Sequence, residues 1–170
     1  MSACVIRRAG PGDLATVAWL RREWTREQQG EPGGPADRGF EQRFAAWFGR
    51  ESPRRITWLA EAGRDRPGLR PAGVMNLAVF ERMPRPGRPP SYWGYLANAF
   101  VLAAHRNQGL GGRLLAALLG YADEHGFARV VLSPSPRSVP FYARAGFGPA
   151  AELMVRPGPG APGWPAAPGG

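Results

Sequence analysis

Arg106-Asn107-Gln108-Gly109-Leu110-Gly111-Gly112 is the stretch that decides the fold of this chain. An apolar run ends just before it, at Leu102, and a helical pattern of leucines begins within it. Glycine lets the backbone approach a ligand closely and adopt positive φ, and the first amides of a helix have no partner inside the helix. Those amides and the positive end of the helix dipole attract anions. The stretch therefore predicts a diphosphate-binding turn between a strand and a helix.

Two common phosphate-binding patterns do not describe this stretch. No Gly-Lys-Ser or Gly-Lys-Thr sequence is present, which excludes a P-loop, and the glycine spacing differs from the Gly-x-Gly-x-x-Gly of dinucleotide-binding folds. Glycine-rich turns between a strand and a helix also occur where packing or tight geometry requires them. The turn by itself leaves both interpretations open, an anion site and a structural turn.

The chain before this stretch opens with a strand and two helices. A short strand is expected at residues 5–6, and Asp13 is expected to cap a helix with an apolar face over residues 14–20. A Gly- and Pro-rich loop over residues 30–39 precedes a second amphipathic helix over residues 40–48. The aromatic stripe of that second helix is expected in the core, with the wall of an acceptor pocket as the alternative.

Three apolar runs then predict an antiparallel meander. They cover residues 56–61, 72–80 and 92–102, and a polar turn over residues 63–71 separates the first two. Residues 82–90 hold so many prolines that backbone donors are missing, so we expect an exposed, basic loop there.

The pattern after the glycines is helical. Leucines recur every four residues at Leu110, Leu114 and Leu118, and Gly126 is placed to end the helix. A short strand over residues 128–132, a short helix around residues 141–144 and a last strand near residues 151–155 are expected to follow. The order of elements predicts an α/β (α+β) fold.

Length and charge limit the classes of protein. The 170 residues are expected to form one domain over residues 1–156, followed by a mobile Pro-, Gly- and Ala-rich tail over residues 157–170. The formal net charge of +9 favours an anionic partner. Because the arginines are scattered along the chain instead of forming a dense basic run, nucleic-acid binding is not favoured.

Cysteine usage and hydropathy indicate the compartment. Cys4 is the single cysteine, and no Cys/His cluster has the spacing of a zinc site, so neither a disulfide nor a metal is expected. No stretch has the apolar length of a signal peptide core or of a membrane span. We expect a soluble, cytoplasmic protein without a membrane partner.

The sequence resembles the GNAT superfamily of acyl-CoA-dependent N-acyltransferases in two separate blocks. Arg106, Gly109 and Gly111 match the motif Arg/Gln-x-x-Gly-x-Gly/Ala. Residues 140–147, Pro-Phe-Tyr-Ala-Arg-Ala-Gly-Phe, look like the family's Phe/Leu-Tyr-x-x-x-Gly-Phe element. The resemblance implies a mixed, mostly antiparallel central sheet that is splayed at an acetyl-CoA cleft and flanked by helices.

The resemblance also implies where acetyl-CoA, as the co-substrate, would bind. Its pantetheine arm would pair with the backbone of Ala99, Phe100 and Val101. Tyr142 matches the tyrosine that is proposed to protonate the departing thiolate, with a half-buried aromatic role as the alternative. Contacts to the pyrophosphate would come from the Arg106 side chain and the amides of Asn107, Gln108, Gly109, Leu110, Gly111 and Gly112. Ser135 stands where many relatives have an asparagine that contacts CoA, and it is the last candidate contact.

The identity of a general base is a separate question, since an alkylamine must lose a proton before it attacks a thioester. Residues 92–102 contain no carboxylate, which excludes a glutamate base from that strand. Glu81, and less so Glu61, stand at or near predicted strand ends and are candidates, although such residues are usually only solvated. Asn98 would orient a water or the acceptor, or serve as a structural amide, and Tyr95 is equally open.

The function expected from the resemblance is N-acetyl transfer from acetyl-CoA to a primary amine, by direct attack in a ternary complex. A small-molecule acceptor is expected, and an arginine-rich rim favours one that carries a carboxylate. The alternatives are a protein N-terminal or lysine acetyltransferase, and a non-catalytic acyl-CoA sensor or interaction module. Either a monomer or a homodimer fits the sequence.

Overall fold

The computed structural model describes residues 3–29, 37–63, 68–156 and 158. Their contacts group the chain into two compact units, Met1–Ser133 and Pro134–Gly170. The predicted tail over residues 157–170 lies outside the described residues apart from Gly158, as does most of the predicted loop over residues 30–39.

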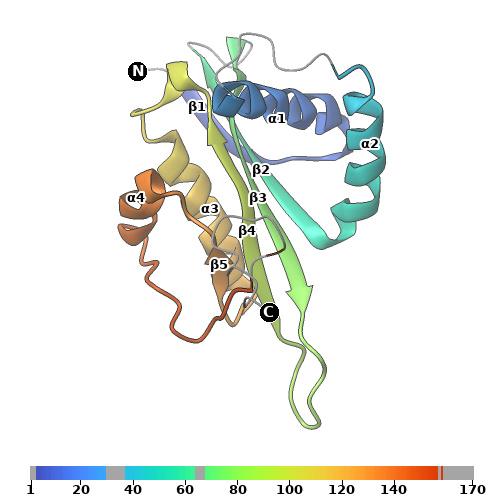
Figure 1. Cartoon of the computed structure of the whole chain (residues 1–170), viewed down its shortest axis with the longest axis vertical. Helices are drawn as coiled ribbons and strands as arrows, with labels where there is room; N and C mark the ends of the chain where they lie inside the picture. The colour runs from blue at the N-terminus through green and yellow to red at the C-terminus, as the bar shows by residue number, and fades with distance from the viewer. Residues whose placement is uncertain (1–2, 30–36, 64–67, 157, 159–170) are drawn as a thin grey trace, which may run out of the picture. The chain divides into compact units, whose positions relative to one another are not determined.

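The first unit is built on a five-stranded sheet in the order β1-β2-β3-β4-β5 (Figure 1). The first four strands pair antiparallel, and β5 pairs parallel with β4. The strands are β1 (Ala3–Arg8), β2 (Arg55–Gly63), β3 (Arg70–Glu81), β4 (Tyr92–Val101) and β5 (Val130–Leu132). The predicted meander is therefore confirmed, and the fold is the expected mixed, mostly antiparallel one.

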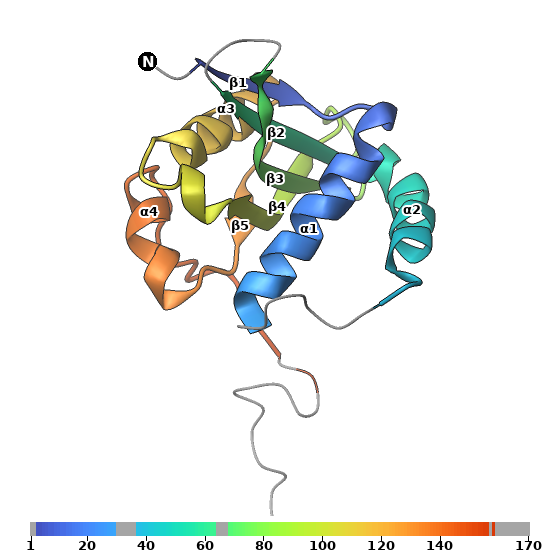
Figure 2. The ribbon, with the colours of Figure 1, turned by 90° about the horizontal axis from the view of Figure 1, so that it is seen from above.

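Helices cover both faces of this sheet (Figure 2). On one face, α1 (Leu14–Gln29) and α2 (Phe40–Glu51) pack over a core that joins Val17 and Leu20 to Leu59, Val74 and Phe100. On the other face lies α3 (Leu110–Glu124), whose buried leucines follow the predicted spacing. Successive side chains of a strand point to opposite faces of the sheet, so a continuous apolar run supplies apolar side chains to both faces.

Two sequence predictions are wrong in detail. Asp13 is not a helix N-cap, because a 3₁₀ turn over Pro11–Asp13 precedes α1. Its carboxylate instead accepts hydrogen bonds from the Gly10 N–H at 2.7 Å and from Arg7. This bidentate pair with Arg7 lowers the pKa of Asp13 to about 2.

The last predicted strand, near residues 151–155, is absent from the described structure. Residues 151–152 form a turn, and residues 153–156 are exposed and irregular. The Leu153 N–H donates to the Ala150 carbonyl at 3.2 Å, so the turn uses an amide that strand pairing would need. The second unit holds instead a 3₁₀ turn, Pro136–Ser138, and the predicted short helix, α4 (Val139–Ala143). No described helix is long and apolar enough to cross a membrane.

Candidate functional site

The second half of β4 has an open edge. Strand β5 pairs with β4 only from Gly94 to Leu96. Directly after that segment the β3–β4 register shifts, since Leu77 pairs with Leu96 but Asn76 pairs with Asn98, which leaves Ala97 as the bulged residue. A bulge bends its strand and changes its twist. Since β5 ends before this point, the edge of β4 beyond the bulge has no strand beside it among the described residues.

The hydrogen-bonding pattern identifies which amides face that open edge. The Leu102 N–H donates to the Ala72 carbonyl of β3 at 2.9 Å. In an antiparallel ladder, every second residue of a strand directs its backbone N–H and C=O groups toward the same neighbouring strand. Phe100, two residues before Leu102, therefore also directs these groups toward β3, and its side chain is buried in the core. Ala99 and Val101 turn theirs to the open edge, where an extended ligand arm can pair with them.

The turn after β4 ends in a helix start with unpaired amides. Asn107 and Gly109 both have left-handed backbone, with φ of 59° and 78°. Gly109 is the N-cap of α3, and the Arg113 N–H makes the first helical bond, to the Gly109 carbonyl at 3.0 Å. The amides of Leu110, Gly111 and Gly112 precede that bond, so they have no partner inside the helix. The turn has the geometry of an anion site at the positive end of a fifteen-residue helix.

The positive charge of the Arg106 side chain is already paired within the protein. Its Nε donates to the Val101 carbonyl at 3.0 Å, and its Nη2 donates to both Glu27 carboxylate oxygens at 2.6 and 2.5 Å. The guanidinium also lies 5.8 Å from the centre of the Phe100 ring. Arg106 therefore ties the turn to the end of α1, and its charge is already paired with Glu27.

A polar row crosses the sheet at the level of the bulge, on the face that α1 and α2 cover. Thr57 pairs with Asn76 in the next strand, and Asn76 pairs with Asn98. Asn76 is buried, donates from Nδ2 to Thr57 Oγ1 at 2.7 Å, and accepts from Arg55 at 3.1 Å. Asn98 accepts from Arg21 Nη1 at 3.1 Å. Asn98 thus lies beside the open edge of β4, with its oxygen engaged by α1.

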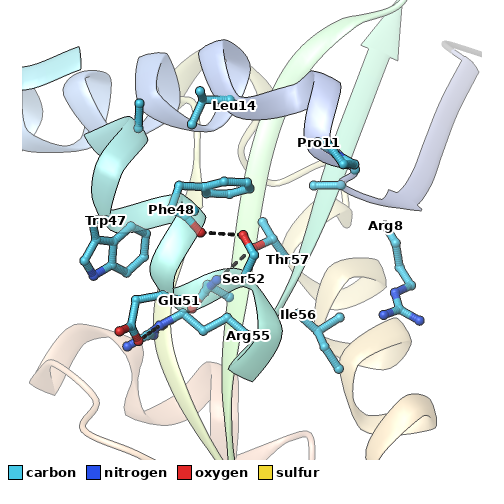
Figure 3. Close-up of a pocket in the computed structure, with 15 residues that line it drawn as sticks. Arg8, Pro11, Leu14, Trp47, Phe48, Glu51, Ser52, Arg55, Ile56 and Thr57 are labelled. Atoms are coloured by element: carbon cyan, nitrogen blue, oxygen red, sulfur yellow. Dashed lines mark hydrogen bonds and ion pairs between the residues drawn. The ribbon is translucent and has the colours of Figure 1, made fainter. Parts of the chain in front are cut away.

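A cavity of about 380 Å³ opens on the same face, between α2 and the starts of β2 and α1 (Figure 3). Trp47 and Phe48 of α2 line it together with Leu14, above the polar floor of Thr57 and Asn76. Phe44 and Phe48 also pack against the core. The aromatic stripe of α2 therefore contributes to the core, as expected from the sequence, and it also lines a cavity.

The two candidate bases lie apart from the polar row. Glu81 ends β3 opposite Tyr92, five residues beyond Asn76, which is roughly 17 Å at about 3.4 Å per residue. Glu61 accepts from Arg7 at 2.8 Å, in an ion pair that Asp13 shares. The structure brings neither carboxylate to the Asn98 level. Among the described residues, no cluster of three His, Cys, Asp or Glu side chains is placed to hold a metal.

The second unit holds Tyr142 and Ser135. Tyr142 is 8% exposed, and its ring makes edge contacts with Phe141 and Phe147 at centroid distances of 5.0 and 5.8 Å. Burial raises the pKa of the Tyr142 phenol, so it stays protonated at neutral pH. The Ser135 hydroxyl lies 3.0 Å from the Ser138 hydroxyl within its own turn.

Sequence reasoning missed Arg21, Glu27 and the Thr57–Asn76 pair. Arg21 stands seven residues after Leu14, so the two residues lie on the same face of α1. That spacing was the one feature of the sequence that could have indicated Arg21. Contacts with β4 and with the turn come from distant parts of the chain, 77 residues away for Arg21 and Asn98.

Comparisons with known proteins agree with this architecture. A model of the acetyltransferase (GNAT) family matches residues 16–147. A predicted acetyltransferase from Clostridium acetobutylicum, solved with acetyl-CoA, is 18% identical with a TM-score of 0.68, over 90% of this chain and 95% of that one. A GCN5-related N-acetyltransferase from Ralstonia eutropha is 25% identical with a TM-score of 0.66, over 90% and 97%. Glucosamine-6-phosphate N-acetyltransferase from Arabidopsis thaliana is 17% identical with a TM-score of 0.62, over 91% and 97%.

Proposed function

We propose, from the premise that this chain belongs to the acetyltransferase (GNAT) family, that it transfers an acetyl group from acetyl-CoA to the primary amine of a small molecule. The observation that carries the proposal is the open edge of β4, which the turn over residues 102–109 joins to the unpaired amides at the start of α3. An extended arm that ends in a diphosphate needs these two features side by side.

Acetyl-CoA supplies the activated acetyl thioester, and this chain would bind and orient it. The pantetheine arm would pair with the backbone of Ala99 and Val101, and the pyrophosphate would bind the amides of Leu110, Gly111 and Gly112. The Val101 carbonyl already accepts from Arg106, so its N–H is the group left for the ligand. Arg106 would act by holding the turn in shape, and its carboxylate partner Glu27 would share that role.

The reaction would be direct attack in a ternary complex. The amine nitrogen forms a bond to the thioester carbonyl carbon, and the C–S bond then breaks. A backbone N–H on the open edge of β4, from Ala99 or Val101, would stabilise the oxyanion, because the Phe100 N–H faces β3. Tyr142 would donate its proton to the departing thiolate, because burial raises the pKa of the phenol and so keeps the proton on Tyr142 at neutral pH until the thiolate forms.

The proton of the attacking amine would pass to water. Glu81 lies far along β3 from the Asn98 level, so it would receive that proton only through a longer chain of waters. Asn98 would orient the first water or the acceptor itself, since its amide lies beside the open edge and Arg21 holds its oxygen. This arrangement predicts a reaction that speeds up as the free amine deprotonates.

The cavity under α2 supports a small acceptor. Its volume of about 380 Å³ is within the usual range for small-molecule sites. Thr57 and Asn76 form its polar floor, and Asn98 pairs with Asn76 in the neighbouring strand. The apolar part of an acceptor would pack against Trp47 and Phe48.

Titration with acetyl-CoA tests the cofactor site. Gly109→Val places a branched side chain where the pyrophosphate would approach, and a Cβ there meets no protein atom within 4 Å. Gly126→Val is the matched control, because Gly126 lies beyond the other end of α3, also has left-handed φ, and also has open space around its Cβ. Both variants carry similar backbone strain. We expect isothermal titration to find at least about tenfold weaker acetyl-CoA binding in Gly109→Val alone.

Other outcomes separate the alternatives. Wild-type protein that does not bind acetyl-CoA would contradict the proposal and favour an interaction module on the same scaffold. Tight binding without thiol release from any amine or peptide would favour an acyl-CoA sensor. Release with peptides alone would favour a protein acetyltransferase.

A further inference from the structure

Arg21 differs from the other arginines of α1 in having no carboxylate partner among the described residues. Arg22 pairs with Glu41, and Arg26 pairs with Glu23. Arg21 contacts the oxygen of Asn98 and stacks over the Trp24 ring, with 4.1 Å from its central carbon to the ring centre. Among the described residues, no carboxylate lies within ion-pair distance of its guanidinium. Arg21 is accessible to solvent, yet the surrounding protein desolvates it enough to lower its pKa.

The contact with Arg21 fixes how Asn98 points. A guanidinium donates hydrogen bonds and accepts none, so the Asn98 oxygen must face Arg21. The Asn98 Nδ2 group then points away with two donors, and no described residue accepts from it. Arg21 and Asn98 together form a cluster of donors beside the bulge of β4 that lacks an acceptor.

We infer that Arg21 and Asn98 bind a carboxylate of the acceptor, so that the substrate is an amino acid or a related amine with a carboxylate near its nucleophilic nitrogen. This inference rests on the proposed function. A guanidinium fork matches the two oxygens of a carboxylate, and stacking on Trp24 holds the fork in place. Asn98 neighbours Ala99, whose backbone is on the open edge, so the bound carboxylate lies close to the reacting carbon.

The charge balance favours a carboxylate over a phosphate or a polycation. One guanidinium and one neutral amide neutralise a single negative charge, whereas a phosphate monoester carries close to two at neutral pH. A polycationic acceptor such as an aminoglycoside would be repelled by Arg21 and by the net charge of +9. The positive charge of Arg21 near the amine of a bound amino acid also disfavours the ammonium form, so it promotes loss of the amine proton to water.

Matched acceptors and variants test the inference. The probes are the proteinogenic amino acids and their carboxamides, with glucosamine 6-phosphate and an aminoglycoside as the other charge classes, assayed by thiol release from acetyl-CoA. We expect an accepted amino acid to have at least about tenfold higher kcat/KM than its carboxamide. Arg21→Gln should remove that preference without changing acetyl-CoA affinity, and Arg21→Lys should restore part of it.

Arg26→Gln is the matched control, because it removes the same charge from the same helix and leaves Arg21 in place. Carboxamides that react as well as the acids, a preference for the phosphate or polycation, or equal effects of Arg21→Gln and Arg26→Gln would each overturn the inference.

A binding measurement keeps the inference separate from the proposed function. N-acetylglycine and N-acetylglycinamide are titrated into labelled protein, and NMR follows the Asn98 side-chain amide and the Arg21 Nε–H. Shifts with the carboxylate alone, lost in Arg21→Gln, support the carboxylate site even if no amine is acetylated. Absence of those shifts in a protein that binds acetyl-CoA overturns the inference and leaves the proposed function standing.

Discussion

Tyr142 keeps its proton because burial disfavours the charged phenolate. A group whose folded pKa is raised loses its proton only above its ordinary range, so the acid form persists throughout neutral pH. If this proton goes to the CoA thiolate, Tyr142→Phe should lower kcat about a hundredfold between pH 7 and 9, with acetyl-CoA affinity unchanged. Steady-state kinetics with matched titrations would measure both quantities.

A matched control for this change is Tyr121→Phe. Tyr121 lies on α3 and packs against Trp58 and His125. The substitution therefore removes a hydroxyl from a comparable aromatic environment, at a residue that has no proposed role in proton transfer. An unchanged kcat together with an unchanged acetyl-CoA affinity in Tyr142→Phe would assign Tyr142 to packing alone. Weaker acetyl-CoA binding with a normal kcat would make it a positioning residue.

Single residues also mark where sequence inference stops. The motif at Arg106, Gly109 and Gly111 predicted the turn correctly, because left-handed φ at Gly109 is a local property that glycine provides. The partners of Arg106 are Glu27 and the Val101 carbonyl, and no local pattern links residue 106 to residue 27. Side-chain partners depend on how helices dock onto the sheet, so they had to be read from the structure.

Elements were predictable where periodicity was strong. The leucine spacing of α3 and the apolar runs of β2, β3 and β4 gave the correct types of element. The run near residues 151–155 has similar composition but forms a turn, since no neighbouring strand pairs with it in the described structure. The bulge at Ala97 was invisible because it depends on register between strands.

Gly73 sets how closely α3 approaches the sheet. A Cβ there would lie 2.9 Å from the Phe100 carbonyl oxygen and 3.3 Å from Leu114 Cδ1. Because one of those atoms is backbone, Gly73→Ala should lower the free energy of unfolding by roughly 1–3 kcal/mol and weaken acetyl-CoA binding as β4 and α3 move. Urea denaturation and isothermal titration would measure the two effects.

Gly120→Ala is the control for that change. Gly120 lies on the exposed side of α3, and a Cβ there meets no atom within 4 Å. Alanine should therefore stabilise the helix by up to about 1 kcal/mol and leave binding unchanged. Equal stability of the Gly73→Ala and wild-type proteins would show that the sheet and helix can separate without cost at this contact.

Charge acts at the scale of the whole molecule. The loop between β3 and β4 carries Arg82, Arg85 and Arg88, and β4 runs ten residues from this loop to the turn before α3. That separation is roughly 30 Å at about 3.4 Å per residue. At such a distance these arginines would act on acetyl-CoA only through the long-range field.

Arg82→Gln, Arg85→Gln and Arg88→Gln together remove three of the nine excess positive charges. The screening length is about 30 Å at 0.01 M salt and about 8 Å at 0.15 M. The triple variant should therefore bind acetyl-CoA with a slower association rate at 0.01 M salt, and with the wild-type rate at 0.15 M. Dissociation should not change, because the loop makes no contact with the ligand in the proposed complex. Stopped-flow binding at both salt concentrations would measure the rates.

A second triple variant distinguishes net charge from a local role of the loop. Arg38, Arg50 and Arg54 are exposed arginines at or near the ends of α2, and their replacement by Gln removes the same charge elsewhere. Similar slowing in both variants at low salt would support a field effect of the whole molecule. Loss of binding in the loop variant alone, at both salt concentrations, would contradict the field effect. At 0.15 M salt the screening length is shorter than the distance from the loop to the turn, so a loss that persists there indicates direct contacts with the ligand. In that case the loop would belong to the binding site, and the placement of acetyl-CoA along β4 would have to extend to both ends of the strand.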